Sequence, residues 1–87
     1  MEVNIYYFSA PWCGPCKQLG PIIDELSKDF KTIGFIKINT DEHPEIAAED
    51  NVISVPTLIA KIDGVNIGRL TGAQTKSVLK SWLKSFE

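Results

Sequence analysis

Two strand-like segments flank one long helix-like segment in the first half of the chain. Residues 3–8 and 33–39 are rich in β-branched and aromatic side chains, a composition typical of strands. Between them, apolar side chains recur at helical spacing: Leu19, Ile22, Ile23, Leu26 and Phe30. A strand–helix–strand succession of this kind forms a parallel strand pair through a right-handed crossover. The first half of the chain therefore predicts an α/β fold.

The long helix is expected to begin between Cys13 and Pro15, because proline is tolerated in the first turn of a helix. Pro21 lies inside the apolar pattern, and we expect it to kink the helix without ending it.

The second half of the chain predicts a short helix followed by a hairpin. The acids and the proline of residues 41–45 favour a helix start, and we expect a short helix through about Glu49. Residues 57–62 and 65–70 are predicted strands, and they are joined at Asp63-Gly64, a strong hairpin signal.

A final helix is expected from about Gln74 to Phe86. Its apolar residues are expected on one face of the helix: Val78, Leu79, Trp82, Leu83 and Phe86. The predicted order is β-α-β-α-β-β-α. Because the hairpin is antiparallel and the first strand pair is parallel, the sheet is expected to be mixed, with helices on both faces.

Length and charge narrow the functional classes. Eighty-seven residues suit a single domain, residues 1–87. The net charge of −2, without clustered Lys or Arg, argues against a nucleic-acid or anionic-membrane partner. The apolar runs are only strand-sized, and residues 1–4 do not resemble a signal peptide. Two cysteines are too few for a disulfide scaffold, so a reducing, cytoplasmic location is expected.

The two cysteines form a Cys-x-x-Cys motif where the long helix begins. Cys13 is expected at the helix N-terminus, where free N–H groups and the helix dipole favour a thiolate. Cys16 lies one turn later and is expected to be less exposed than Cys13. Cys13 can then attack a disulfide, and Cys16 can resolve the mixed disulfide. Pro15 stiffens the segment between them.

Two other interpretations of the cysteine pair carry less weight. A zinc site needs a second pair of ligands, and His43, the only other soft ligand, has no partner beside it. We therefore expect no metal, and we expect His43 to face solvent at a helix start. A pair of cysteines buried by chance is the other alternative, but the motif lies next to a β-α-β pattern, where redox activity is favoured.

The motif and its surroundings resemble the thioredoxin family along essentially the whole chain. The strongest match is the segment from Ala10 to Lys17, which reads Ala-Pro-Trp-Cys-Gly-Pro-Cys-Lys. Further matches lie outside this segment: Pro21, residues 37–41, Val55-Pro56-Thr57, Gly64, Gly72 and Ala73. The resemblance implies a minimal thioredoxin fold, with a four-stranded mixed sheet in the order 2-1-3-4 and three flanking helices.

The resemblance also implies roles for individual residues. Cys13 resembles the attacking cysteine of the family and Cys16 the resolving one. Residues that resemble the apolar rim on which substrates dock are Trp12, Val55, Pro56, Gly72 and Ala73. Pro56 is implied to follow a cis peptide bond and to pack against the cysteines. That bond would direct the backbone N–H and C=O of Val55 at an extended substrate segment.

Several supporting residues keep two interpretations. Gly14 and Pro15 belong to the matching motif. Lys17 is either a solvated lysine or a positive charge beside the thiolate. Lys37 is either an exposed residue of an edge strand or, as the resemblance implies, a neighbour of the resolving cysteine. Trp12 is either a half-buried aromatic residue or a contact for substrate, and its place in the loop beside Cys13 favours contact.

Three departures from the family pattern are visible. The chain begins directly at the strand before the cysteines, so we expect a fold without the extra N-terminal strand and helix of full-length members. Tyr7 stands where those members carry a buried acid, and Ser9 stands where they carry a tryptophan. Alternation from Val3 places Tyr7 on the same sheet face as Ile5, so a packed aromatic side chain with a satisfied hydroxyl is expected.

The predicted function is reduction of protein disulfides by a cytoplasmic monomer that needs no bound cofactor. The resemblance implies that electrons come from a separate thioredoxin reductase, a flavin- and NADPH-dependent enzyme. A glutaredoxin-like enzyme that uses glutathione is the first alternative, favoured by the small size and the missing acid. The second alternative is an interaction subunit that uses the docking surface without redox chemistry.

Overall fold

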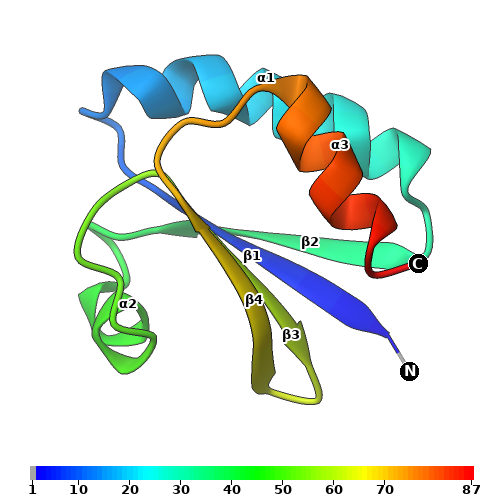
Figure 1. The fold of residues 1–87 in the computed structure, drawn as a ribbon. Coiled ribbons are helices and arrows are strands. Elements are labelled where there is room, and N and C mark those ends of the chain that lie inside the picture. Colours follow the sequence, from blue (N-terminus) through cyan, green and yellow to red (C-terminus); the bar gives the residue numbers. More distant parts are fainter. Residues whose placement is uncertain (1) are drawn as a thin grey trace.

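The computed structural model describes residues 2–87, and Figure 1 shows its strands and helices. The strands are β1 (Val3–Ser9), β2 (Ile33–Asn39), β3 (Thr57–Ile62) and β4 (Val65–Thr71). The helices are α1 (Gly14–Asp29), α2 (Pro44–Glu49) and α3 (Lys76–Lys84). This succession confirms the predicted order. Across residues 2–87, no helix combines the length and the apolar character needed to cross a lipid bilayer.

The strands form one mixed sheet in the order β2-β1-β3-β4, as expected. β1 pairs in parallel with β2 and antiparallel with β3, while β3 and β4 form an antiparallel hairpin. The hairpin turns at Asp63 and Gly64, whose φ angles are 51° and 78°. Positive φ at both central residues matches the right-handed twist of the flanking strands, so the Asp-Gly signal is confirmed.

Helices cover both faces of the sheet (Figure 1). Val3, Ile5 and Tyr7 alternate along β1 and pack against buried side chains of α1 and α3. Phe8 and Ile59 belong to the opposite face, where they pack with Ala47 of α2. The period of two along β1 thus divides the core into two layers.

Helix α1 begins where it was expected. Cys13 is its N-cap residue, Pro15 lies in the first turn, and the helix continues through Pro21 to Asp29. Its buried side chains include three of the predicted apolar positions, namely Leu19, Ile23 and Leu26.

Helix α3 is shorter than predicted, and its apolar face is only partly buried. The hydroxyl of Thr75 accepts a hydrogen bond from the Val78 N–H at 3.2 Å and sets the helix start after Gln74. Leu79 and Leu83 are buried one turn apart, whereas Val78 is 45% exposed. Each residue turns a helix by about 100°, so Val78 points about 100° away from Leu79 and lies at the edge of the apolar stripe.

Candidate active site

One edge of the sheet gathers the segments that carry the predicted site. Ser9 at the end of β1 pairs with Asn39 at the end of β2, because these strands are parallel. Thr57 at the start of β3 pairs with Thr71 at the end of β4, and Phe8 pairs with Thr57. Loops that leave or enter the sheet at this edge therefore meet, although they are far apart in the sequence.

The cysteine pair lies at the N-terminus of α1. Cys13 and Cys16 are joined by a disulfide, with their Cα atoms 5.3 Å apart. The sulfur of Cys13 also accepts the backbone N–H of Cys16 at 3.2 Å, as an N-cap side chain does. The N–H of Cys13 donates to the Ala10 carbonyl at 3.1 Å and fixes the turn that precedes the helix. The exposed residues Gly14, Pro15 and Lys17 complete the first turns.

Exposure does not distinguish the two cysteines, so the expectation that Cys16 is the more sheltered residue is wrong. Cys13 is 4% exposed and Cys16 is 5% exposed. The reason is that Val55 packs over the small cluster formed by Ala10 and both cysteines. The sulfur of Cys13 lies 3.8 Å from the carbonyl oxygen of Val55. The cysteines differ in their neighbours: Cys13 faces Val55, and the backbone of Cys16 faces Tyr7.

Tyr7 is a packed aromatic residue with a satisfied hydroxyl, as predicted. It is 2% exposed, and its hydroxyl donates to the backbone carbonyl of Cys16 at 3.1 Å. Burial raises the pKa of this hydroxyl above its ordinary value of 10.0, and the negative charge of Asp24 acts in the same direction. Tyr7 is therefore protonated near neutral pH and donates its proton to a carbonyl rather than to a sulfur.

A hollow of about 270 Å³ opens beside Cys16 and is lined in part by Tyr7 and Lys37. Lys37 fits both of its interpretations. It belongs to the edge strand β2, and its side chain is 52% exposed and paired with Asp24, with 2.6 Å between Nζ and Oδ1. It also borders the hollow that reaches Cys16.

Trp12 projects from the loop between β1 and α1 and is 69% exposed, so the interpretation as a half-buried residue is wrong. Its indole N–H donates to the Asp41 carboxylate at 3.2 Å. The role of Asp41 was missed by sequence reasoning. The available signal was the parallel pairing of the first two predicted strands, which places the residues after each strand side by side.

A second hollow, of about 120 Å³, lies between Trp12 and the loop that precedes β3. It is lined by Trp12, Thr40, Val52, Ile53, Ser54 and Val55. Ile53 is 97% exposed, the highest exposure among the large apolar side chains in the described part of the chain. Sequence reasoning missed it, although an isoleucine outside every predicted helix and strand was a usable signal.

Pro56 and Gly72 complete the same edge. The Val55–Pro56 peptide bond is cis, as the resemblance implied. The N–H of Gly72 donates to the Pro56 carbonyl at 2.8 Å, and the φ of Gly72 is +87°, which favours glycine. Ala73 follows as an exposed residue. The structure thus brings the predicted rim residues together around the cysteine pair.

The side chains that could bind a metal ion do not lie close together in the described part of the chain. Within residues 2–87, His, Cys, Asp and Glu side chains form no group of three or more that could hold a metal ion. His43 is the exposed N-cap residue of α2, and its ring lies 3.4 Å from the Glu45 carboxylate.

Comparison with known proteins agrees with this geometry. The family model described as thioredoxin matches residues 2–85. The thioredoxin of Pyropia yezoensis is 42% identical over 80 residues, which cover 91% of this chain and 75% of that protein. The chloroplastic M-type thioredoxin of Spinacia oleracea is also 42% identical over 80 residues, but these cover only 44% of its length. The structure of Fasciola hepatica thioredoxin matches with a TM-score of 0.93 at 29% identity, covering 99% of this chain and 82% of that one.

The chain belongs to the thioredoxin family. Together with the Cys13–Cys16 pair, this membership makes the chain a thiol–disulfide oxidoreductase. Thioredoxins act on disulfide substrates and are themselves reduced by a reductase. Tyr7 departs from the family pattern. In the structure it is a buried side chain whose hydroxyl donates a hydrogen bond to the Cys16 carbonyl.

Proposed function

We propose that Cys13 is the attacking cysteine of this oxidoreductase and that Cys16 is the resolving cysteine. The observation that supports these roles is the position of Cys13 as the N-cap residue of α1, where its sulfur accepts the Cys16 N–H at 3.2 Å. The N-terminal amides of a helix favour negative charge, so a thiolate on Cys13 is stabilised. The Cys16 sulfur lies inside the helix, where fewer free amides are available to it.

In the proposed cycle, the Cys13 thiolate attacks one sulfur of a substrate disulfide. A Cys13–substrate bond forms, the substrate disulfide breaks, and the first substrate thiolate leaves. Cys16, once deprotonated, attacks the Cys13 sulfur and releases the second substrate thiolate. The substrate has then gained two electrons, and Cys13 and Cys16 have lost them in forming their disulfide.

Trapping separates the two roles. Cys16→Ser should accumulate a mixed disulfide between Cys13 and a protein substrate, because nothing remains to resolve it. Cys13→Ser should accumulate almost none. Non-reducing electrophoresis followed by mass spectrometry measures both. Equal trapping, or trapping by Cys13→Ser alone, would show that the assignment is wrong.

The docking surface is proposed to consist of the rim around the cysteine pair, in which the buried side chain of Pro56 supports exposed and half-buried neighbours. It contains Trp12, Ile53, Val55, Pro56, Gly72 and Ala73. Support comes from the hollow between Trp12 and Ile53, and from the 3.8 Å between the Cys13 sulfur and the Val55 carbonyl oxygen. A substrate segment attached to Cys13 would lie alongside Val55 and add to its backbone as an extended strand.

The proton of Cys16 is proposed to leave through the hollow that Cys16 shares with Lys37. Tyr7 borders this hollow, but the raised pKa of its hydroxyl makes it unable to accept that proton near neutral pH. Water in the hollow and the departing substrate thiolate are the available acceptors. Lys37 supports the transfer through its positive charge, and Gly14, Pro15 and Lys17 support the thiolate of Cys13.

Electrons are proposed to come from a separate flavin- and NADPH-dependent reductase, and the chain to work as a cytoplasmic, single-domain monomer. The Trp-Cys-Gly-Pro-Cys-Lys segment favours such a reductase over glutathione, whereas the small size of the chain and Tyr7 in place of the acid favour a glutaredoxin-like enzyme. Rates of re-reduction by thioredoxin reductase with NADPH and by glutathione separate these alternatives. Faster re-reduction by glutathione would contradict the proposed reductase. Analytical ultracentrifugation tests the oligomeric state, and a sedimenting mass of two chains would contradict the monomer.

A further inference from the structure

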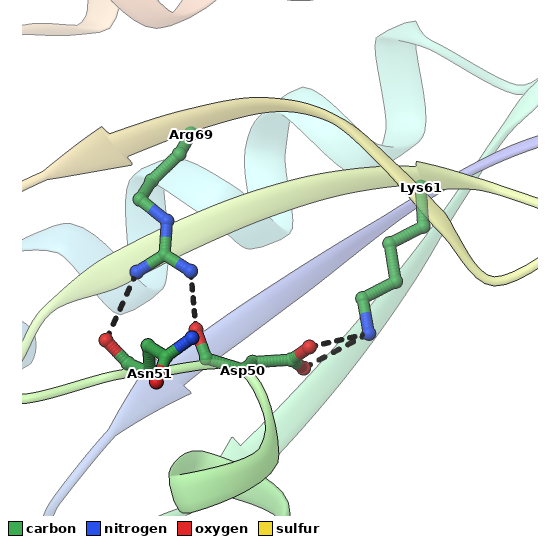
Figure 2. A network of polar contacts seen from close by, with 4 residues as sticks. All are labelled: Asp50, Asn51, Lys61 and Arg69. Carbon is green, nitrogen blue, oxygen red and sulfur yellow. Dashed lines mark hydrogen bonds and ion pairs between the residues drawn. The ribbon is translucent and has the colours of Figure 1, made fainter.

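A polar network holds the turn between α2 and the loop that precedes β3 (Figure 2). The Asp50 network consists of Asp50, Asn51, Lys61 and Arg69. Both carboxylate oxygens of Asp50 accept from the Lys61 ammonium, at 2.8 and 2.9 Å. The two terminal nitrogens of Arg69 donate to backbone carbonyls: one to that of Asn51 at 3.2 Å, the other to that of Asp50. The turn after α2 is therefore hydrogen-bonded to both β3 and β4.

The register of the sheet explains why these side chains meet. Ile59 on β3 pairs with Tyr6 on β1 and with Arg69 on β4, so these three residues form a row across the sheet. Lys61 follows Ile59 by two residues and shares its face, which is the face that α2 covers. The Lys61 ammonium also lies 4.8 Å from the centre of the Tyr6 ring. The side chains of Lys61 on β3 and Arg69 on β4 therefore contact the residues that follow α2.

The ion pair in this network is largely shielded from solvent. The side chains of Lys61 and Asp50 are 15% and 11% exposed, whereas those of the Lys76–Glu25 pair between α3 and α1 are 44% and 58% exposed. A shielded pair of charges contributes little net stability compared with an apolar pair, but it demands a defined geometry. The forked contact of Arg69 with two carbonyls is likewise specific to a guanidinium.

The segment that follows the network carries two residues of the proposed docking surface, Ile53 and Val55. Asn51 has a φ of 55°, and the chain then runs through Val52 and Ile53 to Val55. The Val52 N–H donates to the Ala47 carbonyl at 2.8 Å. At the other end, the Thr57 hydroxyl donates to the Ser54 carbonyl at 2.8 Å. Residues 51–55, the docking loop, are thus held at both ends, and Ile53 projects from the middle at 97% exposure.

We propose that Asp50, Lys61 and Arg69 are positioning residues for substrate docking. They touch neither the cysteines nor the substrate; they fix the start of the docking loop, so that Ile53 and Val55 meet a protein segment bound beside Cys13. The inference rests on the proposed docking surface. It predicts that losing the network weakens the capture of protein disulfides and leaves the chemistry at Cys13 unchanged.

The test compares a protein disulfide with a small one. Arg69→Met keeps the aliphatic stem and removes the donors. With insulin as substrate, its KM should rise about tenfold, because small misplacements of a positioning group weaken binding steeply, while kcat stays within about twofold. With hydroxyethyl disulfide, which is too small to reach the docking loop, the rate should not change. Arg69→Lys should fall between the parent and Arg69→Met, since an ammonium cannot hold both carbonyls in a fork.

A matched control is Lys76→Met, which removes one positive charge and the ion pair between α3 and α1, on the face of the sheet opposite to α2. It should leave KM for insulin unchanged. Hydrogen exchange at the Val52 amide adds a readout independent of activity: it should accelerate in Arg69→Met and not in Lys76→Met. If Arg69→Met does not fold, Arg69→Lys, which keeps the charge, replaces it in the test. Its KM for insulin and its hydrogen exchange at the Val52 amide are then compared with those of the parent.

Ile53→Ser separates failure of the inference from failure of the docking surface. If Ile53→Ser raises KM for insulin and the Arg69 variants do not, the docking surface stands and the positioning role is overturned. If Ile53→Ser leaves KM unchanged, Ile53 is not part of the docking surface, and the positioning role is overturned with it. A rise in KM for all these variants, with unchanged rates on hydroxyethyl disulfide, supports both.

Discussion

At the residue scale, the Tyr7 hydroxyl is a structural group rather than a chemical one. It donates to the Cys16 carbonyl at 3.1 Å and is shielded from solvent. Tyr7→Phe should therefore lower the free energy of unfolding by about 0.5–1.5 kcal/mol, the net contribution of one hydrogen bond. Disulfide reduction should remain within a few-fold of the parent. Urea unfolding and insulin reduction measure the two effects, and a hundredfold loss of rate in a folded variant would place the hydroxyl in the reaction.

The same residue predicts a pH dependence of stability. Because the pKa of Tyr7 is raised by burial, the folded protein holds this proton more tightly than the unfolded chain does. The corresponding stability is fully present below the pKa of the unfolded chain, about 10, and is lost as pH rises through the higher pKa of the folded protein. As pH rises above about 10, the parent should lose more stability than Tyr7→Phe. Parallel curves for the two proteins would contradict a raised pKa.

At the scale of single elements, the start of α3 depends on Thr75. Its hydroxyl accepts the Val78 N–H, one of the helix N–H groups that have no partner within the helix. Thr75→Ala should lower the free energy of unfolding by about 1 kcal/mol, the usual cost of losing an N-cap side chain. Ser77→Ala, at an exposed position inside the same helix, is the control and should change stability little. Equal losses in the two variants would mean that the cap contributes nothing.

Elements with strong local patterns were predictable from the sequence, and contacts between distant segments were not. The hairpin at Asp63-Gly64 and the start of α1 follow from residues within a few positions of each other. Apolar spacing placed Val78 on the correct side of α3 but did not show that it remains exposed, because spacing alone does not fix the limits of a packed stripe. The same holds for the site. The cysteine motif is local, whereas Trp12 and Asp41 are 29 positions apart and meet only because β1 and β2 pair.

At the scale of the whole molecule, stability is expected to depend on the sheet and its two core layers rather than on the redox disulfide. Cys13 and Cys16 are only three positions apart, so their bond closes a very short loop. In the chain-entropy account, such a loop stabilises a protein by about 2 kcal/mol at most, much less than a bond that closes a long loop. Both redox states should therefore fold.

Unfolding in urea with and without dithiothreitol should give free energies that differ by no more than about 2 kcal/mol. By linkage, this difference equals the shift in reduction potential between the folded protein and its unfolded chain, at about 30 mV for each 1.4 kcal/mol. Equilibration with glutathione, for the folded protein and for the chain unfolded in urea, measures that shift independently, so the two experiments must agree. A Cys13→Ser/Cys16→Ser double variant is the control and should not respond to dithiothreitol. If the reduced parent were unfolded, the disulfide would be a structural bond, and the proposed cycling of Cys13 and Cys16 between dithiol and disulfide would be untenable.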